Sequence, residues 1–180
     1  MNDSNTPNSF KAEEWHFVGP ISSFPDLYQL EGNESGSQVR PACKTLHIPK
    51  IEHPDKTKSR STRSNLDEQV LVFKYRGLMH AIDNKCPHSS FPLREGKILD
   101  IEDAGASIRC FRHGWTFELG SGMKVRERGN GTSRLVLWDV EVRDSVESGS
   151  GYGSASASGF EYEKENEKEK EVWVRRRRAG

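Results

Sequence analysis

Short runs of apolar and β-branched residues recur through the middle of the chain, and many of them are bounded by Gly, Pro, Asp or Asn. Runs of this length and composition are typical of β-strands. Between residues 69 and 143 no long stretch has the pattern of an amphipathic helix, in which apolar residues return about every 3.6 positions. We therefore expect strands at residues 15–20, 44–48, 69–75, 78–83, 97–101, 106–110, 114–119, 123–126 and 135–143.

The strongest hairpin signal lies in residues 69–83. The runs QVLVFKY and LMHAID both have strand composition, and only Arg76 and Gly77 separate them. A two-residue connection that contains Gly favours a tight turn between antiparallel strands. We expect these two runs to pair.

A further strand near the end of the chain is separated from its expected partner by a long insertion. Trp138, Val140 and Val142 alternate with charged residues, which is the pattern of a half-buried strand. The stretch EVWVRRRR, which begins at residue 171, again has strand character. We expect it to pair with residues 135–143, because the residues between them have the Gly/Ser-rich and charged composition of a flexible segment.

These patterns divide the chain into four parts and favour an all-β fold, since many short strands are separated by turn residues. The parts are a polar and disordered tail at residues 1–14, a β-domain at 15–143, a flexible and charged insertion at 144–170, and a final strand with a basic tail at 171–180.

Composition narrows the function classes. Apolar residues make up only 33% of the chain and charged residues 30%, so we expect part of the chain to lie outside the core. Lys and Arg together number 27, as do Asp and Glu, and this balance argues against general nucleic-acid binding. The apolar runs are far shorter than the roughly 20 residues that span a bilayer, and the polar start resembles no signal peptide. We expect a soluble, cytoplasmic protein without a membrane or nucleic-acid partner.

The cysteines do not form a disulfide framework, because there are only three of them, Cys43, Cys86 and Cys110. In a reducing compartment they remain thiols that can bind a metal. Cys43 stands apart from the other chemistry, and we expect an idle or packed side chain there. We expect the same of four scattered histidines, His16, His47, His53 and His80.

Two short motifs each combine a cysteine with a histidine. Cys86-x-His88 and Cys110-x-x-His113 both stand beside expected strands and are followed by turn-forming residues. Unrelated core side chains are one interpretation, and a structural Cys₂His₂ zinc site is a second. Zinc fingers, however, group Cys with Cys and His with His. Mixed pairs suit a [2Fe-2S] cluster that has thiolates on one iron and imidazoles on the other.

At these residues the chain resembles the Rieske [2Fe-2S] iron–sulfur family. The resemblance is closest from Val70 to Val125 and covers most of residues 15–143 in outline. It implies an all-β, Rieske-type fold of stacked antiparallel β-sheets, with a cluster-binding subdomain formed by two hairpin loops. Besides the two motifs, the matching residues are Pro92, Leu93, Gly96, Gly114, Phe117, Gly120 and Gly122.

The resemblance implies one [2Fe-2S] cluster per chain, with Cys86 and Cys110 on one iron and His88 and His113 on the other. One departure is that Phe111 follows the second cysteine, where the family usually has Pro. Another is that residues 98–107 form a longer connection than usual.

The chain also lacks features of the high-potential members of that family, which join their two loops by a disulfide and direct a Ser and a Tyr hydroxyl at the cluster. The corresponding positions hold Phe91 and Arg112, and Trp115 and Phe117. We therefore expect a reduction potential towards the lower end of the Rieske range of about −150 to +300 mV. Thr116 is the remaining hydroxyl, and strand alternation turns it away from the cluster.

Three functions follow from this interpretation. The favoured one is a ferredoxin-like carrier, or an electron-transfer subunit, that passes single electrons between a reductase and an acceptor. A complete Rieske oxygenase would need a second iron held by two His and a carboxylate, and no such motif follows His113. The alternative is a non-catalytic module in which a cluster or zinc is structural or acts as a sensor, and the charged insertion binds a partner.

Overall fold

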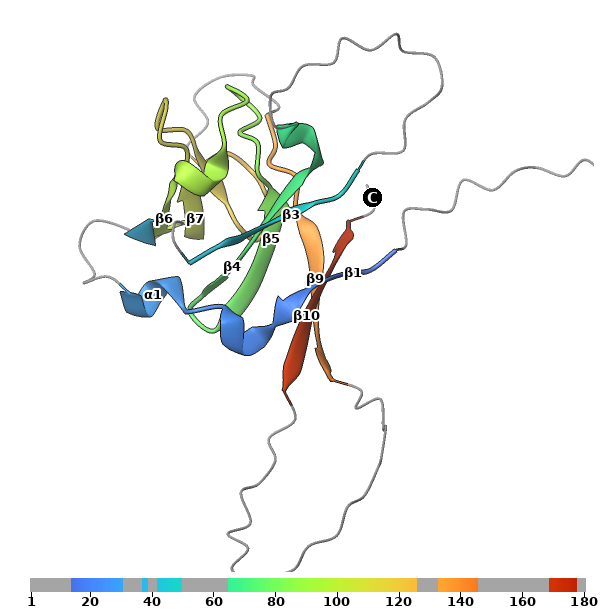
Figure 1. Ribbon diagram of the computed structural model, residues 1–180. Helices are drawn as coiled ribbons and strands as arrows, with labels where there is room; N and C mark the ends of the chain where they lie inside the picture. Colours follow the sequence, from blue (N-terminus) through green and yellow to red (C-terminus); the bar gives the residue numbers. More distant parts are fainter. Residues whose placement is uncertain are drawn as a thin grey trace, which may run out of the picture.

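Three antiparallel sheets make up the structure, a computed structural model that describes residues 14–30, 37–38, 42–49, 65–125, 133–145 and 169–177 (Figure 1). The sheet orders are β1-β10-β9, β2-β6-β7-β8 and β3-β4-β5. The strands are β1 (His16–Pro20), β2 (Ser37–Gln38), β3 (Lys44–His47), β4 (Gln69–Tyr75), β5 (Leu78–Asp83), β6 (Lys97–Ile101), β7 (Gly105–Arg109), β8 (Thr116–Glu118), β9 (Trp138–Asp144) and β10 (Lys170–Arg176). Short helical turns lie at Ile21–Ser23, Leu27–Leu30 (α1), Leu66–Glu68 and Leu93–Glu95. The expected all-β fold is confirmed.

Strand β4 lies at the centre of the molecule and is buried on both faces. Leu71 and Phe73 face a core that extends under the β6–β7–β8 sheet. Val70 and Val72 face a second core, which β10 closes with Val172 and Val174. This explains why the run QVLVFKY is nearly continuous in apolar residues, since a strand covered on both sides has no solvent face to carry polar ones.

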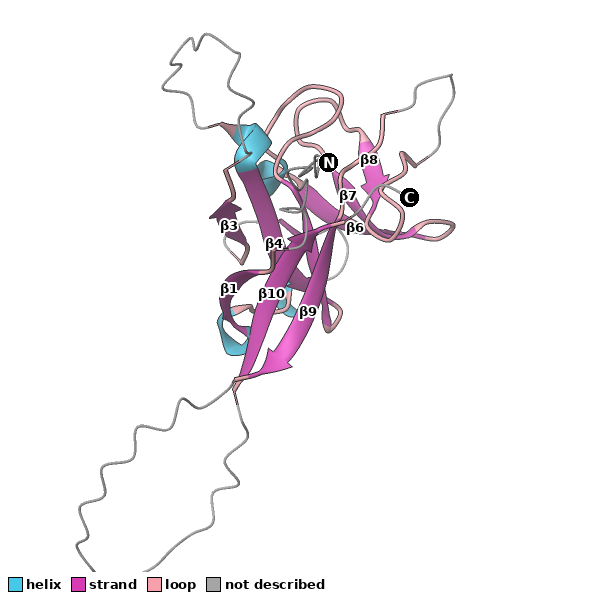
Figure 2. Cartoon of the chain, turned by 90° about the vertical axis from the view of Figure 1, so that its right-hand side faces the viewer, coloured by secondary structure: helices cyan, strands magenta, loops and turns pink. Residues whose placement is uncertain are grey.

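The pairing of the last strand across the insertion is confirmed. Strand β10 lies antiparallel to β9, with Val172 opposite Val142 and Val174 opposite Val140, and β1 covers its other edge. Figure 2 shows this sheet extending away from the end of the molecule that carries β6, β7 and β8. The half-buried pattern of β9 holds only in part, because Val142 is 39% exposed. Its strand is an edge of the sheet and is covered less well than β10.

The hairpin of β4 and β5 has the expected tight turn, and a distant carboxylate secures it. Arg76 and Gly77 both have positive φ angles, 50° and 76°, as a two-residue turn of this kind requires. Asp26, just before α1, accepts hydrogen bonds from the backbone N–H groups of Arg76 (2.9 Å) and Gly77 (2.6 Å). It also accepts one from the N–H of Tyr28, so one side chain joins the start of the helix to the hairpin.

Three expected strands differ from the observed ones. The strand expected at residues 135–143 begins only at Trp138 and ends at Asp144. Strand β8 is shorter than residues 114–119, because its first two expected positions belong to a loop. Within 123–126 the described residues form no strand, and only an isolated bridge joins Lys124 to Phe117. The chain turns there, since Gly122 has a φ of 74° and its N–H donates to the carbonyl of Glu118.

Several expectations fall outside the described residues. They concern the tail at residues 1–13, His53, the insertion at 146–168 and Arg178. In the part of the chain that the structure describes, no helix has the length and apolar character needed to cross a membrane.

Candidate metal centre

Both Cys–His motifs lie in loops at the same end of the molecule. The first loop, residues 84–96, joins β5 to β6 in a different sheet and is drawn in light green at the top of Figure 1. The second loop, residues 110–115, connects the hairpin strands β7 and β8. Strands β6 and β7 pair directly, which places the end of the first loop beside the start of the second.

The two loops have the same backbone hydrogen bonds. In the first, the N–H of Cys86 donates to the carbonyl of Phe91 (2.8 Å), and the N–H of Ser90 donates to the carbonyl of Cys86 (2.9 Å). In the second, the N–H of Cys110 donates to the carbonyl of Trp115 (2.8 Å), and the N–H of Gly114 donates to the carbonyl of Cys110 (3.0 Å). The residues that close the turns, Ser90 and Gly114, both have positive φ angles. Each cysteine is therefore held at the base of the same kind of turn.

The two thiols are buried next to each other. Cys86 and Cys110 are 0% and 1% exposed and belong to the same core. Burial raises the pKa of the Cys110 thiol, and the neighbouring Cys86 raises it further. Hydrogen bonds from the backbone N–H of Arg112 and from the hydroxyl of Ser89 lower this pKa. Two adjacent thiols in an apolar setting can ionise together only beside a cation, which is what a metal supplies.

The two imidazoles lie at the surface, in contrast to the buried thiols. His88 and His113 are both exposed, and their ring centroids are 5.1 Å apart with the planes at 81°. His88 stacks on Trp115 with a centroid distance of 3.8 Å and an angle of 15°. The ammonium of Lys124 lies 3.6 Å from the Trp115 centroid, so the indole has a cationic neighbour as well.

Two further features bring the loops close together, besides the stacking of His88 on Trp115. The guanidinium of Arg112 lies over the ring of Phe91, 5.9 Å from its centroid. A Cβ on Gly96 would come within 2.6 Å of the carbonyl oxygen of Arg109, which directly precedes Cys110. Only glycine permits this close approach of the two backbones.

The hydroxyls near the site differ from the expected set. Thr116 donates to the backbone carbonyl of Gly114 and accepts a hydrogen bond from the Arg109 guanidinium. Trp115 is partly buried, and Phe117 is 0% exposed in the core beneath it. The sequence reasoning missed Ser89, whose hydroxyl oxygen lies 3.9 Å from the Cys110 sulfur. Its place next to a ligand candidate was a signal that could have identified it.

The other singled-out residues lie elsewhere. Cys43 packs at the edge of the core that contains the two buried thiols. The Nε2 of His47 lies 3.3 Å from Oε2 of Glu68, and the ring of His80 stacks against that of Phe73. His16 is in β1. None of these described residues joins the two loops.

The donor set fits a binuclear iron cluster. The thiols of Cys86 and Cys110 are neighbours, and the imidazole centroids of His88 and His113 are 5.1 Å apart. Among the described residues, no group of three His, Cys, Asp or Glu side chains converges on a position for a single ion. A [2Fe-2S] cluster needs no such convergence, because each iron takes two protein ligands and two bridging sulfides.

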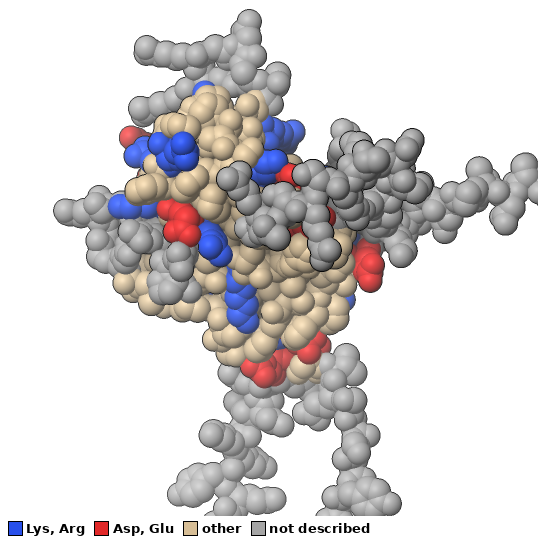
Figure 3. Space-filling model, turned by 45° about the horizontal axis from the view of Figure 1, so that its top comes forward, with Lys and Arg blue, Asp and Glu red and all other residues tan. Residues whose placement is uncertain are grey.

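The surface around this end carries charges of both signs. Figure 3, which turns the top of the molecule forward, shows Lys and Arg in separate patches with Asp and Glu between some of them. Arg94, on the first loop, is paired with its neighbour Glu95. Arg112, on the second, is exposed and lies over Phe91.

Comparison with known proteins gives the family. The model of the Rieske [2Fe-2S] domain matches residues 46–136, which is just over half of the chain and includes both loops. The ferredoxin component of the alkene monooxygenase system of Xanthobacter autotrophicus is 39% identical over 59 residues, which are 33% of this chain and 45% of that protein. The 4beta-methylsterol monooxygenase of Methylococcus capsulatus is 36% identical over 62 residues, 33% of this chain and 15% of that protein.

A solved structure also aligns with the chain. It is the complex of reduced oxygenase and oxidised ferredoxin in carbazole 1,9a-dioxygenase, with 17% identity, 89% of this chain and 92% of that chain covered, and a TM-score of 0.44. The segments shared with the two curated relatives span less than half of either one. A Rieske domain is defined by its [2Fe-2S] cluster, so the family implies this cofactor. The match of the family model, which includes both cysteine–histidine loops, shows that this chain belongs to the Rieske [2Fe-2S] domain family.

Proposed function

We propose that the chain holds one [2Fe-2S] cluster between its two loops and carries single electrons between protein partners. In this proposal Cys86 and Cys110 bind one iron, and His88 and His113 bind the other. The protein then acts as a ferredoxin-like carrier or as the electron-transfer subunit of a redox enzyme.

One observation carries this proposal. The two loops share the same turn, and this turn places both thiols in the core and both imidazoles at the surface. A cluster with unlike irons needs such a division, with a pair of thiolates on one side and a pair of imidazoles on the other.

The side chains have distinct roles in electron transfer. When bound, the cluster accepts and releases one electron. Cys86 and Cys110 keep their end of the site away from water, since neither is more than 1% exposed. His88 and His113 reach the surface, where a partner can approach them closely. Trp115 covers one face of the His88 ring and restricts its motion.

The proposed partners are a reductase that donates electrons and an enzyme that accepts them. The alkene monooxygenase ferredoxin component is the relative whose printed role agrees with this proposal. We place the protein in the cytoplasm, because Cys86 and Cys110 lie side by side without a disulfide and a reducing compartment preserves such thiols. The proposal involves no nucleic acid and no membrane.

The second candidate is a non-catalytic module in which the same four residues hold a structural zinc or a sensing cluster. Two cysteines and two histidines are also a good tetrahedral zinc set, and this favours keeping the candidate. It differs from the first in its redox behaviour, since zinc has no accessible second oxidation state in proteins.

The two candidates are separated by metal analysis and a redox titration of protein purified without oxygen. The electron-carrier proposal predicts about two irons and two acid-labile sulfides per chain, with reversible one-electron reduction. It also predicts a midpoint potential below roughly +100 mV, because Trp115 and Phe117 supply no hydroxyl to the cluster. One zinc per chain and no reducible centre would support the structural module and exclude electron transfer.

A further inference from the structure

A stack of three side chains lies beside the two loops. The indole of Trp115 packs against the His88 ring at a centroid distance of 3.8 Å, and the ammonium of Lys124 lies 3.6 Å from the same indole centroid. Two groups this close to one ring centre cannot share a face, so Lys124 and His88 cover opposite faces of the indole. A cation is therefore separated from a proposed iron ligand by one aromatic ring.

The backbone holds Lys124 at this position. After β8 the chain turns and runs back beside that strand. The N–H of Val125 donates to the carbonyl of Thr116 (2.9 Å), and the N–H of Glu118 donates to the carbonyl of Met123 (2.9 Å). These two hydrogen bonds flank Lys124 and limit where its side chain can reach.

No neighbouring carboxylate neutralises the charge of Lys124 in the described part of the chain. Lys124 lines a groove of about 350 Å³, to which Arg109 adds a second cation and Ile101 and Val125 add apolar surface. None of the described residues that line this groove is acidic. The ion pairs between described residues do not include Lys124 either. Its positive charge is therefore uncompensated next to the stack.

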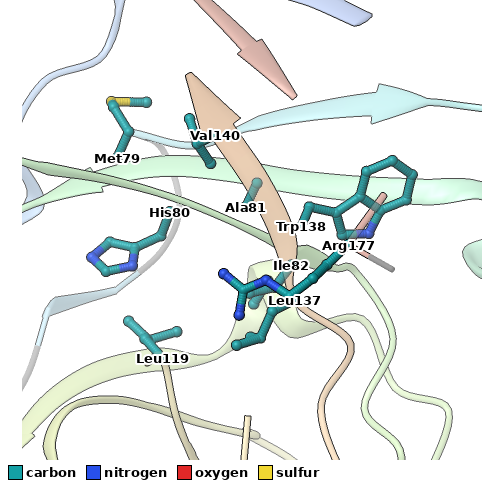
Figure 4. A pocket seen from close by; sticks show the side chains of 9 residues that line it. All are labelled: Met79, His80, Ala81, Ile82, Leu119, Leu137, Trp138, Val140 and Arg177. Carbon is teal, nitrogen blue, oxygen red and sulfur yellow. The ribbon is translucent and has the colours of Figure 1, made fainter. Parts of the chain in front are cut away.

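Arg177 is a cation in the opposite situation. It lines a different cavity, of about 200 Å³, together with residues of β5 and β9 (Figure 4). Its Nε donates to Asp139 (3.0 Å), so a carboxylate lies directly against its charge. None of the described residues that line this cavity belongs to either loop. Arg177 therefore provides a comparison in which the same charge is paired and lies outside the stack.

We propose that Lys124 raises the reduction potential of the cluster and that Trp115 keeps this charge at a fixed distance from His88. The inference rests on the proposed function. Reduction adds one negative charge, which is favoured on the iron bound by two neutral imidazoles, because the anionic thiolates repel it. An uncompensated cation on the His88 side stabilises that added charge.

The test is a redox titration of the full-length, cluster-containing protein at low ionic strength, monitored by visible absorption. Lys124→Gln and Lys124→Met should each decrease the equilibrium constant for reduction about threefold to tenfold. This lowers the midpoint potential by roughly 30–60 mV, at about 59 mV per tenfold for one electron. Lys124→Arg, which keeps the charge, should retain the wild-type potential. Arg177→Gln, which removes one paired charge elsewhere, should retain it as well.

Salt dependence separates an electrostatic role of Lys124 from a packing role. The difference in midpoint potential between wild type and Lys124→Gln should shrink as sodium chloride is raised to about 1 M, where the screening length is about 3 Å. A difference that salt does not change, or an equal decrease in Lys124→Arg, would show that Lys124 acts by packing and would overturn the inference.

Two further outcomes would also count against the inference. A wild-type potential in Lys124→Gln would show that the charge has no effect on the cluster, and an equal decrease in Arg177→Gln would show a general effect of net charge. In both cases a reducible cluster is still measured, so the proposed function stands while the role of Lys124 is lost. A wild-type protein without a reducible centre would overturn the inference and the proposed function together.

Discussion

The hydroxyl oxygen of Ser89 lies 3.9 Å from the sulfur of Cys110, although the two residues belong to different loops. In the shared turn, Ser89 follows Cys86 by three positions, as His113 follows Cys110. The hydroxyl is therefore directed towards the space between the loops. A donor at this sulfur stabilises extra negative charge, which is the charge that reduction of a bound cluster adds.

Ser89→Ala should lower the midpoint potential of the cluster. A typical net hydrogen bond contributes about 0.5–1.5 kcal/mol, which corresponds to roughly 20–60 mV for one electron. The measurement is a redox titration monitored by visible absorption. Ser90→Ala is the matched control, because Ser90 is exposed and makes only backbone contacts in the loop. Equal potentials for Ser89→Ala and the wild type would show that this hydroxyl does not act on the site.

Gly96→Ala should destabilise the fold and loosen the cluster site. The new Cβ would lie 2.6 Å from the carbonyl oxygen of Arg109 and 2.9 Å from that of Leu93, and neither backbone group can move independently of its strand or turn. Overpacking of this kind costs about 1–3 kcal/mol. Urea unfolding followed by circular dichroism measures the change. Gly120→Ala is the control, because its Cβ would meet only the flexible carboxylate of Glu118. Equal stability of both variants would contradict the proposed role of Gly96.

Asp26→Asn should weaken the β4–β5 hairpin by about 1–2 kcal/mol at neutral pH, because an amide replaces an acceptor-only carboxylate that receives three backbone N–H groups. Although burial raises the pKa of Asp26, hydrogen bonds from Gly77, Tyr28 and Arg76 and the charge of Lys74 bring it below its ordinary value.

A lowered pKa means that the unfolded state binds the proton more readily than the folded state. The stability contributed by Asp26 is therefore present above its unfolded pKa of about 3.9 and is lost as the pH falls through the folded value. The difference in the free energy of unfolding between wild type and Asp26→Asn, measured by urea unfolding, should therefore shrink over the same pH range. An Asp103→Asn control, at an exposed turn, should show no such difference.

His80 should make the protein less stable at mildly acidic pH. Burial lowers its pKa, so the unfolded state binds a proton more readily than the folded state below about pH 6.5. The free energy of unfolding then falls as the pH falls from about 6.5 through the folded pKa. His80→Phe should reduce this slope in urea unfolding. An unchanged slope in His80→Phe would show that His80 is not its source.

The sequence was most informative where packing is strongest. The run of β4, the hairpin turn at Arg76 and Gly77, and the pairing of β9 with β10 could all be predicted, because the buried valines and the turn glycine leave direct patterns. The alternation of apolar and charged residues did not predict that Val142 is exposed, since alternation cannot show that a strand lies at the edge of a sheet.

The two Cys–His motifs are visible in the sequence, and the sequence does not predict the geometry around them. Asp26 secures a turn that is 50 positions away, and Ser89 approaches a sulfur 21 positions away. Neither contact has a periodic signal, because both depend on how the loops and sheets come together. The lysine above Trp115 was missed for a related reason, since residues 123–126 were expected to form a strand and instead turn back towards the site.

The most direct test of the proposed cluster is electron paramagnetic resonance of anaerobically purified protein before and after reduction with dithionite. The account predicts an oxidised form that is coloured and gives no electron paramagnetic resonance signal. The reduced form should give a signal with the low average g value of a cluster that has two imidazole ligands. Cys110→Ala should abolish this signal and Cys43→Ala should retain it, because only the first removes a proposed ligand. A colourless protein that contains zinc, or a reduced signal with the higher average g value of an all-cysteine cluster, would contradict the proposed ligation by His88 and His113.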